Sequence, residues 1–208
     1  MIYEVRTYTL RPGTVGEFEE RFAKRKPLRD KHSKLGAFWH TDFGPLNQVI
    51  HVWPYDDLQQ RAAVRDAMAK DDALRQIPGG GDLIVGQEAE IMNPAPFMHP
   101  LGSRDYGKGN VYEMRIYTFA PGDIPKVLDG WGKAIEAREK FSPLAACWTS
   151  ELGGLNKFVH TWVYKDLNER VRIREESRKG GQWPPQTGVR PIRQENKLLI
   201  PAAFSPVG

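Results

Sequence analysis

The stretch YEVRTYTLRPG at Tyr3–Gly13 recurs, with few changes, as YEMRIYTFAPG at Tyr112–Gly122. Side chains alternate across a β-strand, so each copy of the stretch presents two different faces. In the first copy one face carries Tyr3, Val5 and Thr7, and the other carries Glu4, Arg6 and Tyr8. Pro12 and Gly13 then end the strand. A Glu, an Arg and a Tyr kept twice on one strand face indicate a repeated folding unit.

The repeat extends over most of the 208 residues. An offset of 109 residues relates Tyr3 to Tyr112, and the offset drops to 107 where Gln87 corresponds to Gln194. The segment between the copies, HPLGSRDYGKGN, is polar, rich in glycine and without periodicity, which is typical of a linker. We therefore predict two homologous halves with a linker between them, with the bounds 1–98, 99–110 and 111–208.

Each half has the pattern β-α-β-β-α-β. Alternating apolar residues predict the strands Ile2–Leu10, Ala37–Phe43, Val49–Tyr55, Ala146–Leu152 and Phe158–Tyr164. The helices are expected to begin at the N-cap residues Thr14, Asp57, Asp123 and Asp166, with Glu17 completing a capping box after Thr14. This order predicts an α+β fold in which each half is a ferredoxin-like unit, a four-stranded antiparallel sheet with both helices on one face.

A sheet that is covered by helices on one face leaves its other face open. We expect the helices to cover the face bearing Val5, Ile50 and Val52, which leaves the face of Glu4 and His51 uncovered. That second face is rich in aromatic residues, so full exposure to water is unfavourable. Two such sheets in one chain can bury these faces against each other. We therefore predict an intrachain pseudo-dimeric α/β barrel whose interior is lined by the polar and aromatic residues.

Composition and charge limit the partners that the chain can have. It contains 40% hydrophobic residues and carries a formal net charge of +4, with acidic residues mixed through its basic stretches. That mixture argues against a nucleic-acid partner, and no apolar run approaches the ~20 residues that span a bilayer. Because the first strand begins at Ile2, we expect no targeting segment, no membrane partner and a cytoplasmic location. The single cysteine, Cys147, excludes an intramolecular disulfide and a CxxC site.

Two further patterns are assigned to structure rather than to chemistry. His40 and Asp42 lack the HxxxH or paired-cysteine spacing of a metal site, so neither a metal nor a cofactor is expected. The basic run RVRIREESRKGG, Arg170–Gly181, places Arg170 and Arg174 at helical spacing with glutamates beside them. We interpret this run as a solvent-exposed helix face with i,i+4 ion pairs and not as a nucleic-acid site.

The two halves also resemble a known family. The opening YEVRTYTLRPG, the hairpin ending in VIHVWPYDDLQQR, and their second copies YEMRIYTFAPG and FVHTWVYKDLNER are similar to the NIPSNAP family. The resemblance covers nearly the whole chain, once per half, and it implies the ferredoxin-like barrel of the wider dimeric α/β-barrel superfamily. It implies no particular reaction, because related barrels include cofactor-independent monooxygenases, haem-dependent enzymes and small stress-response proteins.

Polar and aromatic residues that occur in both halves form the candidate site. His51 and His160 are the candidate catalytic acid or base, because the ordinary pKa of histidine lies near neutrality. Glu4 and Arg6 are expected to pair and to clamp an anion, and the aromatic side chains are expected to hold a flat ligand. The candidate ligand-binding residues are Glu4, Arg6, Tyr8, Trp53, Tyr55, Glu113, Arg115, Tyr117, Trp162 and Tyr164.

Two functions remain open from the sequence. One is the binding of a small organic molecule, anionic or aromatic, in the barrel cavity, with or without cofactor-independent acid/base chemistry. The other is a non-enzymatic scaffold or adaptor that acts through protein–protein contacts, in which the Glu and Arg residues form structural ion pairs. A homo-oligomer is compatible with both. The first function predicts that replacing His51 and His160 with Phe abolishes ligand binding without unfolding the protein.

Overall fold

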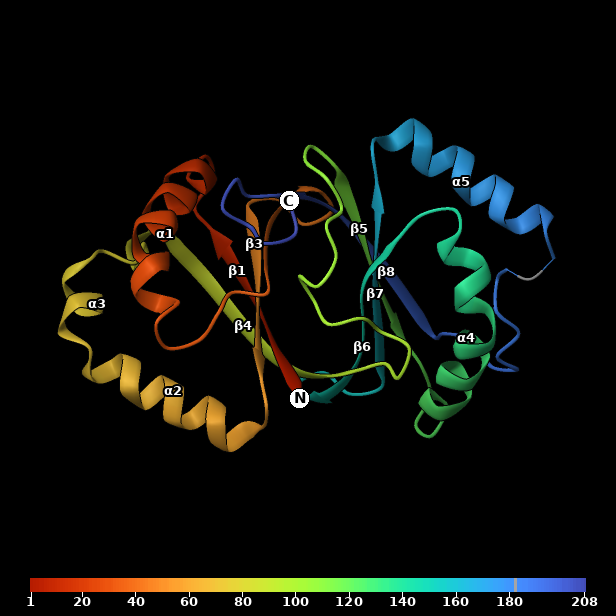
Figure 1. The fold of residues 1–208 in the computed structure, drawn as a ribbon, viewed down its shortest axis with the longest axis horizontal. Coiled ribbons are helices and arrows are strands. Elements are labelled where there is room, and N and C mark those ends of the chain that lie inside the picture. The colour runs from red at the N-terminus through yellow and green to blue at the C-terminus, as the bar shows by residue number, and fades with distance from the viewer. Residues whose placement is uncertain (182) are drawn as a thin grey trace.

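The computed structural model describes residues 1–181 and 183–208, and its strands form one closed barrel with helices packed outside (Figure 1). The first half contains β1 (Ile2–Leu10), α1 (Val15–Arg29), β2 (Ala37–Phe43), β3 (Gln48–Tyr55), α2 (Leu58–Lys70), α3 (Asp72–Gln76), the 3₁₀ turn η1 (Gly81–Leu83) and β4 (Ile84–Pro94). The second half contains β5 (Val111–Thr118), α4 (Ile124–Glu139), β6 (Leu144–Leu152), β7 (Lys157–Tyr164), α5 (Leu167–Lys179) and β8 (Arg193–Pro201). The first two strands have their predicted bounds, whereas β3, β6 and β7 begin one or two residues earlier than predicted.

Within each half the strands pair antiparallel in the ferredoxin-like order, β4-β1-β3-β2 in the first half and β8-β5-β7-β6 in the second. The edge strands of one half pair with those of the other, β2 with β8 and β4 with β6. Closure therefore satisfies the hydrogen-bonding groups that an open sheet would leave at its edges. The prediction of two ferredoxin-like repeats that form an intrachain pseudo-dimeric α/β barrel is confirmed.

The barrel interior is apolar, and the prediction that the polar face lines it is wrong. Val5, Ile50 and Val52 belong to a buried cluster that contains residues of both halves, among them Trp39 and Trp148. The residues that alternate with them lie on the outer face of the sheet, towards the helices; they include Glu4, Arg6, Tyr8, His51, Trp53 and Tyr55. The helix-covered face of each sheet is thus the polar and aromatic one.

Exclusion of water explains this choice of face. Side chains from both halves fill the barrel interior, so a charged group placed there would lose its hydration. The helices of the first half cover the outer face loosely, because α2 buries none of its residues and α1 buries only Phe18 and Arg29, whereas α4 of the second half buries six. Charged side chains on the outer face find partners on the helices, as Glu4 does with Arg61 of α2. The barrel interior, which excludes water, therefore takes the more apolar face of each sheet.

The helix N-termini confirm part of the predicted capping. Asp57 accepts a hydrogen bond from the backbone N–H of Gln60 at 2.8 Å, and Asp166 accepts one from the backbone N–H of Glu169 at 2.7 Å. The capping box at Thr14 is wrong, because the Thr14 hydroxyl donates to the carbonyl of Arg11 and makes no cap bond. Asp123 likewise makes no side-chain cap bond. The capped helices α2 and α5 start directly after the strands β3 and β7.

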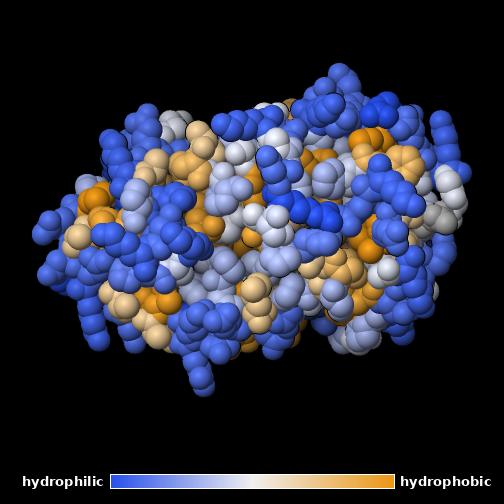
Figure 2. Space-filling model, in the orientation of Figure 1, coloured by the Kyte–Doolittle hydropathy of each residue, from blue (hydrophilic) through white to orange (hydrophobic). Residues whose placement is uncertain are grey.

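The segment between the halves covers part of the barrel core. Residues 99–110 form turns and contain no regular helix or strand. Leu101 and Tyr106 pack against the interior cluster, and the backbone N–H of Leu101 donates to the Tyr3 hydroxyl at 3.3 Å. Figure 2 shows that hydrophilic residues cover most of the visible face and that apolar residues form small separate patches. In the described part of the chain, no helix has the length and apolar character needed to cross a membrane.

Because the barrel interior is apolar and filled, removing a large side chain from it should strongly lower the free energy of unfolding. Trp39 is 0% exposed in the barrel cluster, so the substitution Trp39→Ala should lower the free energy of unfolding by about 3–5 kcal/mol. Phe43 lies on the same strand but is 61% exposed, so Phe43→Ala should change it by less than about 0.5 kcal/mol. Urea denaturation of both variants measures the difference. Equal effects would contradict the placement of Trp39 in the core.

Candidate functional site

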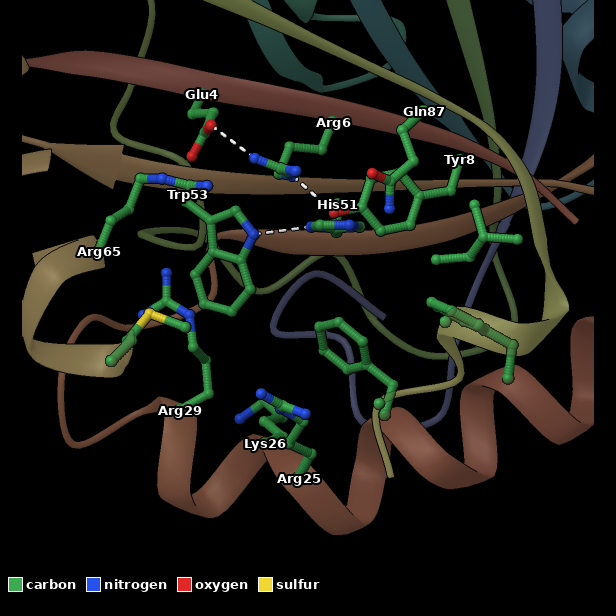
Figure 3. Close-up of a pocket in the computed structure, with 16 residues that line it drawn as sticks. Glu4, Arg6, Tyr8, Arg25, Lys26, Arg29, His51, Trp53, Arg65 and Gln87 are labelled. Atoms are coloured by element: carbon green, nitrogen blue, oxygen red, sulfur yellow. Dashed lines mark hydrogen bonds and ion pairs between the residues drawn. The ribbon is translucent and has the colours of Figure 1, made fainter. Parts of the chain in front are cut away.

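Two pockets lie between the sheet and the helices, one in each half. Their volumes are about 500 Å³ and about 450 Å³, which suits a small molecule. In the first pocket, shown in Figure 3, the strands supply Glu4, Arg6, Tyr8, His51 and Trp53, and the helices supply Arg25, Lys26, Arg29 and Arg65. The second pocket is lined by the counterparts Arg115, Tyr117, His160, Trp162, Arg138 and Arg174.

The pockets lie on opposite sides of the barrel, because α1 and α2 pack on one side and α4 and α5 on the other (Figure 1). The expectation that both sets of residues line one barrel cavity is therefore wrong. Sequence reasoning grouped each set correctly, since cross-strand partners share a face and the β1–β3 register places Arg6 opposite His51. It assigned the group to the wrong side of the sheet.

A buried carboxylate holds two arginines in the first pocket. Glu4 is 1% exposed, and its Oε1 accepts hydrogen bonds from Arg6 Nη1 at 2.9 Å and from Arg61 Nη2 at 2.6 Å. Arg6 Nε also donates to the Tyr8 hydroxyl at 2.7 Å. Burial favours a raised pKa for Glu4, but the hydrogen bonds and charges of Arg61 and Arg6 outweigh it and lower that pKa. Glu4 therefore stays ionised and is a poor general base.

The second half repeats this network and corrects one prediction. Glu113 Oε1 accepts from Arg115 Nη1 at 2.9 Å and from Arg170 Nη2 at 2.5 Å, while Arg174 Nη1 lies 3.5 Å from Oε2. Arg170 and Arg174 thus point inward, and their assignment to a solvated helix face is wrong. The exposed i,i+4 ion pair on α5 is made by Arg172 instead. The inward-pointing arginines reach a carboxylate that local helix spacing could not reveal.

The His51 side chain is fixed as a hydrogen-bond donor. Trp53 Nε1 donates to His51 Nδ1 at 2.7 Å, as the dashed line in Figure 3 shows. An indole N–H can only donate, so His51 Nδ1 is unprotonated and the proton of the neutral imidazole lies on Nε2. This Nε2 is buried and has no hydrogen-bond partner among the described residues. The Tyr8 ring stands beside the imidazole at 87°, with the ring centroids 4.8 Å apart.

Burial keeps the imidazole neutral in both halves. Desolvation, followed by the charges of Arg6 and Arg29, lowers the pKa of His51 to about 3. Desolvation, followed by the charges of three arginines, lowers the pKa of His160 well below its ordinary value. Trp162 Nε1 donates to His160 Nδ1 at 2.8 Å, and the buried His160 Nε2 again has no partner within the described chain. Each pocket thus contains an N–H donor that is ready for an acceptor.

A buried arginine in each pocket was not predicted from the sequence. Arg29 is 8% exposed, its guanidinium lies 3.9 Å above the Trp53 ring, and Nη2 donates to the Tyr55 hydroxyl at 3.0 Å. Its Nη1 donates to the Ser33 hydroxyl at 2.6 Å and to the Ser33 carbonyl at 3.5 Å. Its contacts are thus neutral groups. Desolvation lowers the pKa of Arg29.

Arg138 repeats these contacts in the second half. It is 2% exposed, lies 4.2 Å above the Trp162 ring and donates to the hydroxyls of Tyr164 at 3.1 Å and Ser142 at 2.9 Å. The signal that could have revealed the pair is the offset of 109 residues, which relates Arg29 to Arg138. Tyr55 and Tyr164, predicted as ligand-binding residues, position these arginines, and Tyr164 also lines the second pocket.

Metal binding has no structural support in the described ranges 1–181 and 183–208. No group of three or more His, Cys, Asp or Glu side chains there is arranged to hold a metal ion. The polar partner of His40 is a carboxylate, since its Nδ1 lies 2.8 Å from Glu19 Oε1. Cys147 is buried, and desolvation raises its pKa, so its thiol is not activated as a nucleophile.

The buried histidines predict how stability depends on pH. In the unfolded chain His51 and His160 bind protons as the pH falls through about 6.5, whereas His51 in the folded protein stays neutral to a pH of about 3. The unfolded state then binds more protons, so stability should fall as the pH is lowered from 7 to 4. The double substitution His51→Gln and His160→Gln should make this loss smaller, as measured by urea denaturation at each pH. An unchanged pH dependence would show that the imidazoles are charged when folded.

Comparison with known proteins agrees with this architecture. The family model described as NIPSNAP matches residues 3–99 and 112–206. Protein NipSnap homolog 3A of Homo sapiens is 32% identical over 218 residues, covering 100% of this chain and 86% of the relative. Protein NipSnap of Drosophila melanogaster is 26% identical over 216 residues, covering 99% and 78%. A solved anthrone oxidase-like protein is similar in fold alone, with a TM-score of 0.62 at 10% identity over 99% of this chain and 93% of that one. The chain therefore belongs to the NIPSNAP family and carries two copies of its domain in tandem.

Proposed function

We propose that each half of the chain binds a small organic anion in the pocket between its sheet and its helices. The observation that carries this proposal is that Arg29 and Arg138 are buried guanidinium groups without a carboxylate partner in the described part of the chain. A buried charge that lacks a counter-ion costs several kcal/mol of free energy. A bound anion would supply the missing counter-charge and recover part of that cost.

The neighbouring histidine adds directional recognition to this charge. Arg29 and His51 contact the same indole, because the guanidinium lies over the Trp53 ring and the imidazole accepts the indole N–H. The free Nε2–H of His51 can therefore donate to an oxygen of a ligand whose negative charge lies near Arg29. An unpaired buried donor is unfavourable until it finds an acceptor. Both groups favour a ligand that carries oxygen atoms and negative charge.

The other charges of the first pocket also leave an excess of positive charge. Glu4 is shared by Arg6 and Arg61, and the Lys26 ammonium pairs with the aspartate that directly follows α1. Arg25 and Arg65 line the pocket and have no ion-pair partner within residues 1–181 and 183–208. The positive potential of a partly enclosed pocket raises the local concentration of anions. The volume of about 500 Å³ restricts the ligand to a small molecule.

The geometry favours a donor role for His51 and His160 over the general-base role that the sequence suggests. The lone pair on His51 Nδ1 is already used by Trp53, and a pKa of about 3 means that the imidazole holds no second proton to give as an acid near neutrality. A neutral imidazole N–H can stabilise negative charge that develops on a ligand oxygen. Cofactor-independent chemistry in these pockets would therefore use the imidazole as an electrophile.

The proposal predicts that the buried arginines serve binding more than folding. In the substitution Arg29→Met the side chain retains most of its volume while the unpaired charge is removed, so stability should change by less than about 1 kcal/mol. Anion affinity at the first pocket should fall about 10- to 100-fold, because a charge-assisted contact is lost. Isothermal titration calorimetry with citrate and with 2-naphthoate measures the affinity, and Arg138→Met tests the second pocket.

Lys197→Met provides a matched control for this experiment. Lys197 is 9% exposed and its ammonium donates to the neutral Gln48 amide at 2.8 Å, but it lines neither pocket. The substitution Lys197→Met should therefore leave anion binding unchanged. If Arg29→Met destabilises the protein strongly and leaves binding intact, Arg29 is a structural residue and the proposal fails. Native mass spectrometry of the purified protein gives an independent result, since a retained anion would be released on denaturation.

A protein-contact function is the second candidate, and one observation favours it. The tips of the β2–β3 and β6–β7 hairpins expose apolar side chains, with Phe43 at 61%, Leu46 at 65%, Leu152 at 49% and Leu155 at 60%. Scattered exposed apolar residues are common on proteins. If these tips form a contact with another copy of the chain, Leu46→Ser and Leu155→Ser together should lower the mass measured by light scattering. An unchanged monomeric mass would remove support for self-association through these hairpins.

A further inference from the structure

The two pockets share a common core but differ in their helix walls. The residues that both retain include the arginine–tyrosine pair on the first strand, the histidine–tryptophan pair and the buried arginine. The corresponding residues of the first and second pockets are Arg6 and Arg115, Tyr8 and Tyr117, His51 and His160, Trp53 and Trp162, and Arg29 and Arg138. The shared core suits a feature common to both ligands, an oxygen atom with negative charge. The differing walls determine what else each ligand can carry.

In the first pocket the α1 wall is charged. Arg25 and Lys26 line it, and Figure 3 shows both side chains below the imidazole and the indole. Arg25 Nη1 donates to the carbonyl of Ile77 at 3.0 Å, which holds the guanidinium at the pocket wall without neutralising it. The positions that correspond in the second half are Ala134 and Ile135, both buried and apolar. At these two positions only the first pocket presents positive charge; the further arginine of the second pocket, Arg178, lies on α5 instead.

In the second pocket the same wall is aromatic. Trp131 takes the place of Phe22, and Trp183 adds a third indole to the wall that Trp131 and Trp162 form. The Trp183 ring packs edge-on against Trp131 with centroids 4.8 Å apart and against Trp162 with centroids 5.7 Å apart. The Arg138 guanidinium lies 5.8 Å from the Trp183 ring. An aromatic ring of a ligand can stack on such a wall while its charge faces the guanidinium.

We propose that the two pockets bind different classes of organic anion, an inference that rests on the function proposed above. The first pocket takes an anion with at least two negatively charged groups, one at the shared core and one at Arg25. The second pocket takes an aromatic anion whose charged group lies at the shared core and whose ring packs on Trp183. Arg25 and Trp183 are then the residues that determine specificity, although neither belongs to the repeated core.

The test uses two probes, citrate as the multiply charged anion and 2-naphthoate as the aromatic anion, in calorimetric titrations of the full chain. Arg138→Met isolates the first pocket and Arg29→Met isolates the second; Arg174→Ala and Arg65→Ala serve if a buried substitution does not fold. We expect Arg25→Ala to weaken citrate binding at the first pocket about 10-fold and to leave 2-naphthoate binding unchanged. We expect Trp183→Ala to weaken 2-naphthoate binding at the second pocket about 10-fold and to leave citrate binding unchanged. Lys24→Ala, an exposed residue on α1 outside the pocket, is the control.

The outcomes separate this inference from the proposed function. If both probes bind both pockets with affinities within about threefold of each other, the difference in ligand class is overturned while anion binding stands. The same follows if Arg25→Ala and Trp183→Ala weaken both probes equally. If neither probe binds the unaltered protein, the proposed function itself is overturned. Tryptophan fluorescence adds a local readout, because 2-naphthoate should quench it in the protein with Trp183 and less in Trp183→Ala.

Discussion

The closure of two four-stranded sheets into one barrel determines where each functional side chain lies. Closure creates an interior that side chains of both halves fill, so that interior takes the face with Val5, Ile50, Trp39 and their counterparts. The charged and aromatic face is then left for the helices. It is not sealed by α2, which buries none of its residues, or by α5, which buries only Ile173 and Ser177. Both pockets follow from this single constraint. The tandem repeat produces the pockets in pairs because each half contributes one sheet and its helices.

The electrostatics of the pockets depend on their partial burial. Burial lowers the pKa of His51 and of Arg29, yet the guanidinium remains the charged form of arginine near neutrality, whereas the imidazole becomes neutral. The indole of Trp53 then fixes which imidazole nitrogen carries the proton. One tryptophan thus positions both the charged guanidinium of Arg29 and the directional N–H donor of His51. Full exposure to water would weaken both the charge and the hydrogen bond as means of recognition.

The sequence predicts the fold well because the repeat restricts it twice. Strand alternation identified which side chains share a face, and Asp57 and Asp166 marked the starts of α2 and α5 correctly. Alternation could not show which face would turn inward, because that depends on the packing of the other half of the chain. Arg29 was missed because a lone arginine near a helix end belongs to no motif. Arg170 and Arg174 were misassigned because their carboxylate partner, Glu113, lies far away in the sequence.

We propose that anions bind outside the barrel, at the buried arginine and the histidine N–H of each half. The most direct measurement is a crystal structure of the protein grown in sodium bromide, with the bromide located by its anomalous scattering. We expect bromide in both pockets, within contact distance of Arg29 and His51 Nε2 in one and of Arg138 and His160 Nε2 in the other. Pockets without bromide, in crystals that bind bromide at other positions, would contradict this proposal.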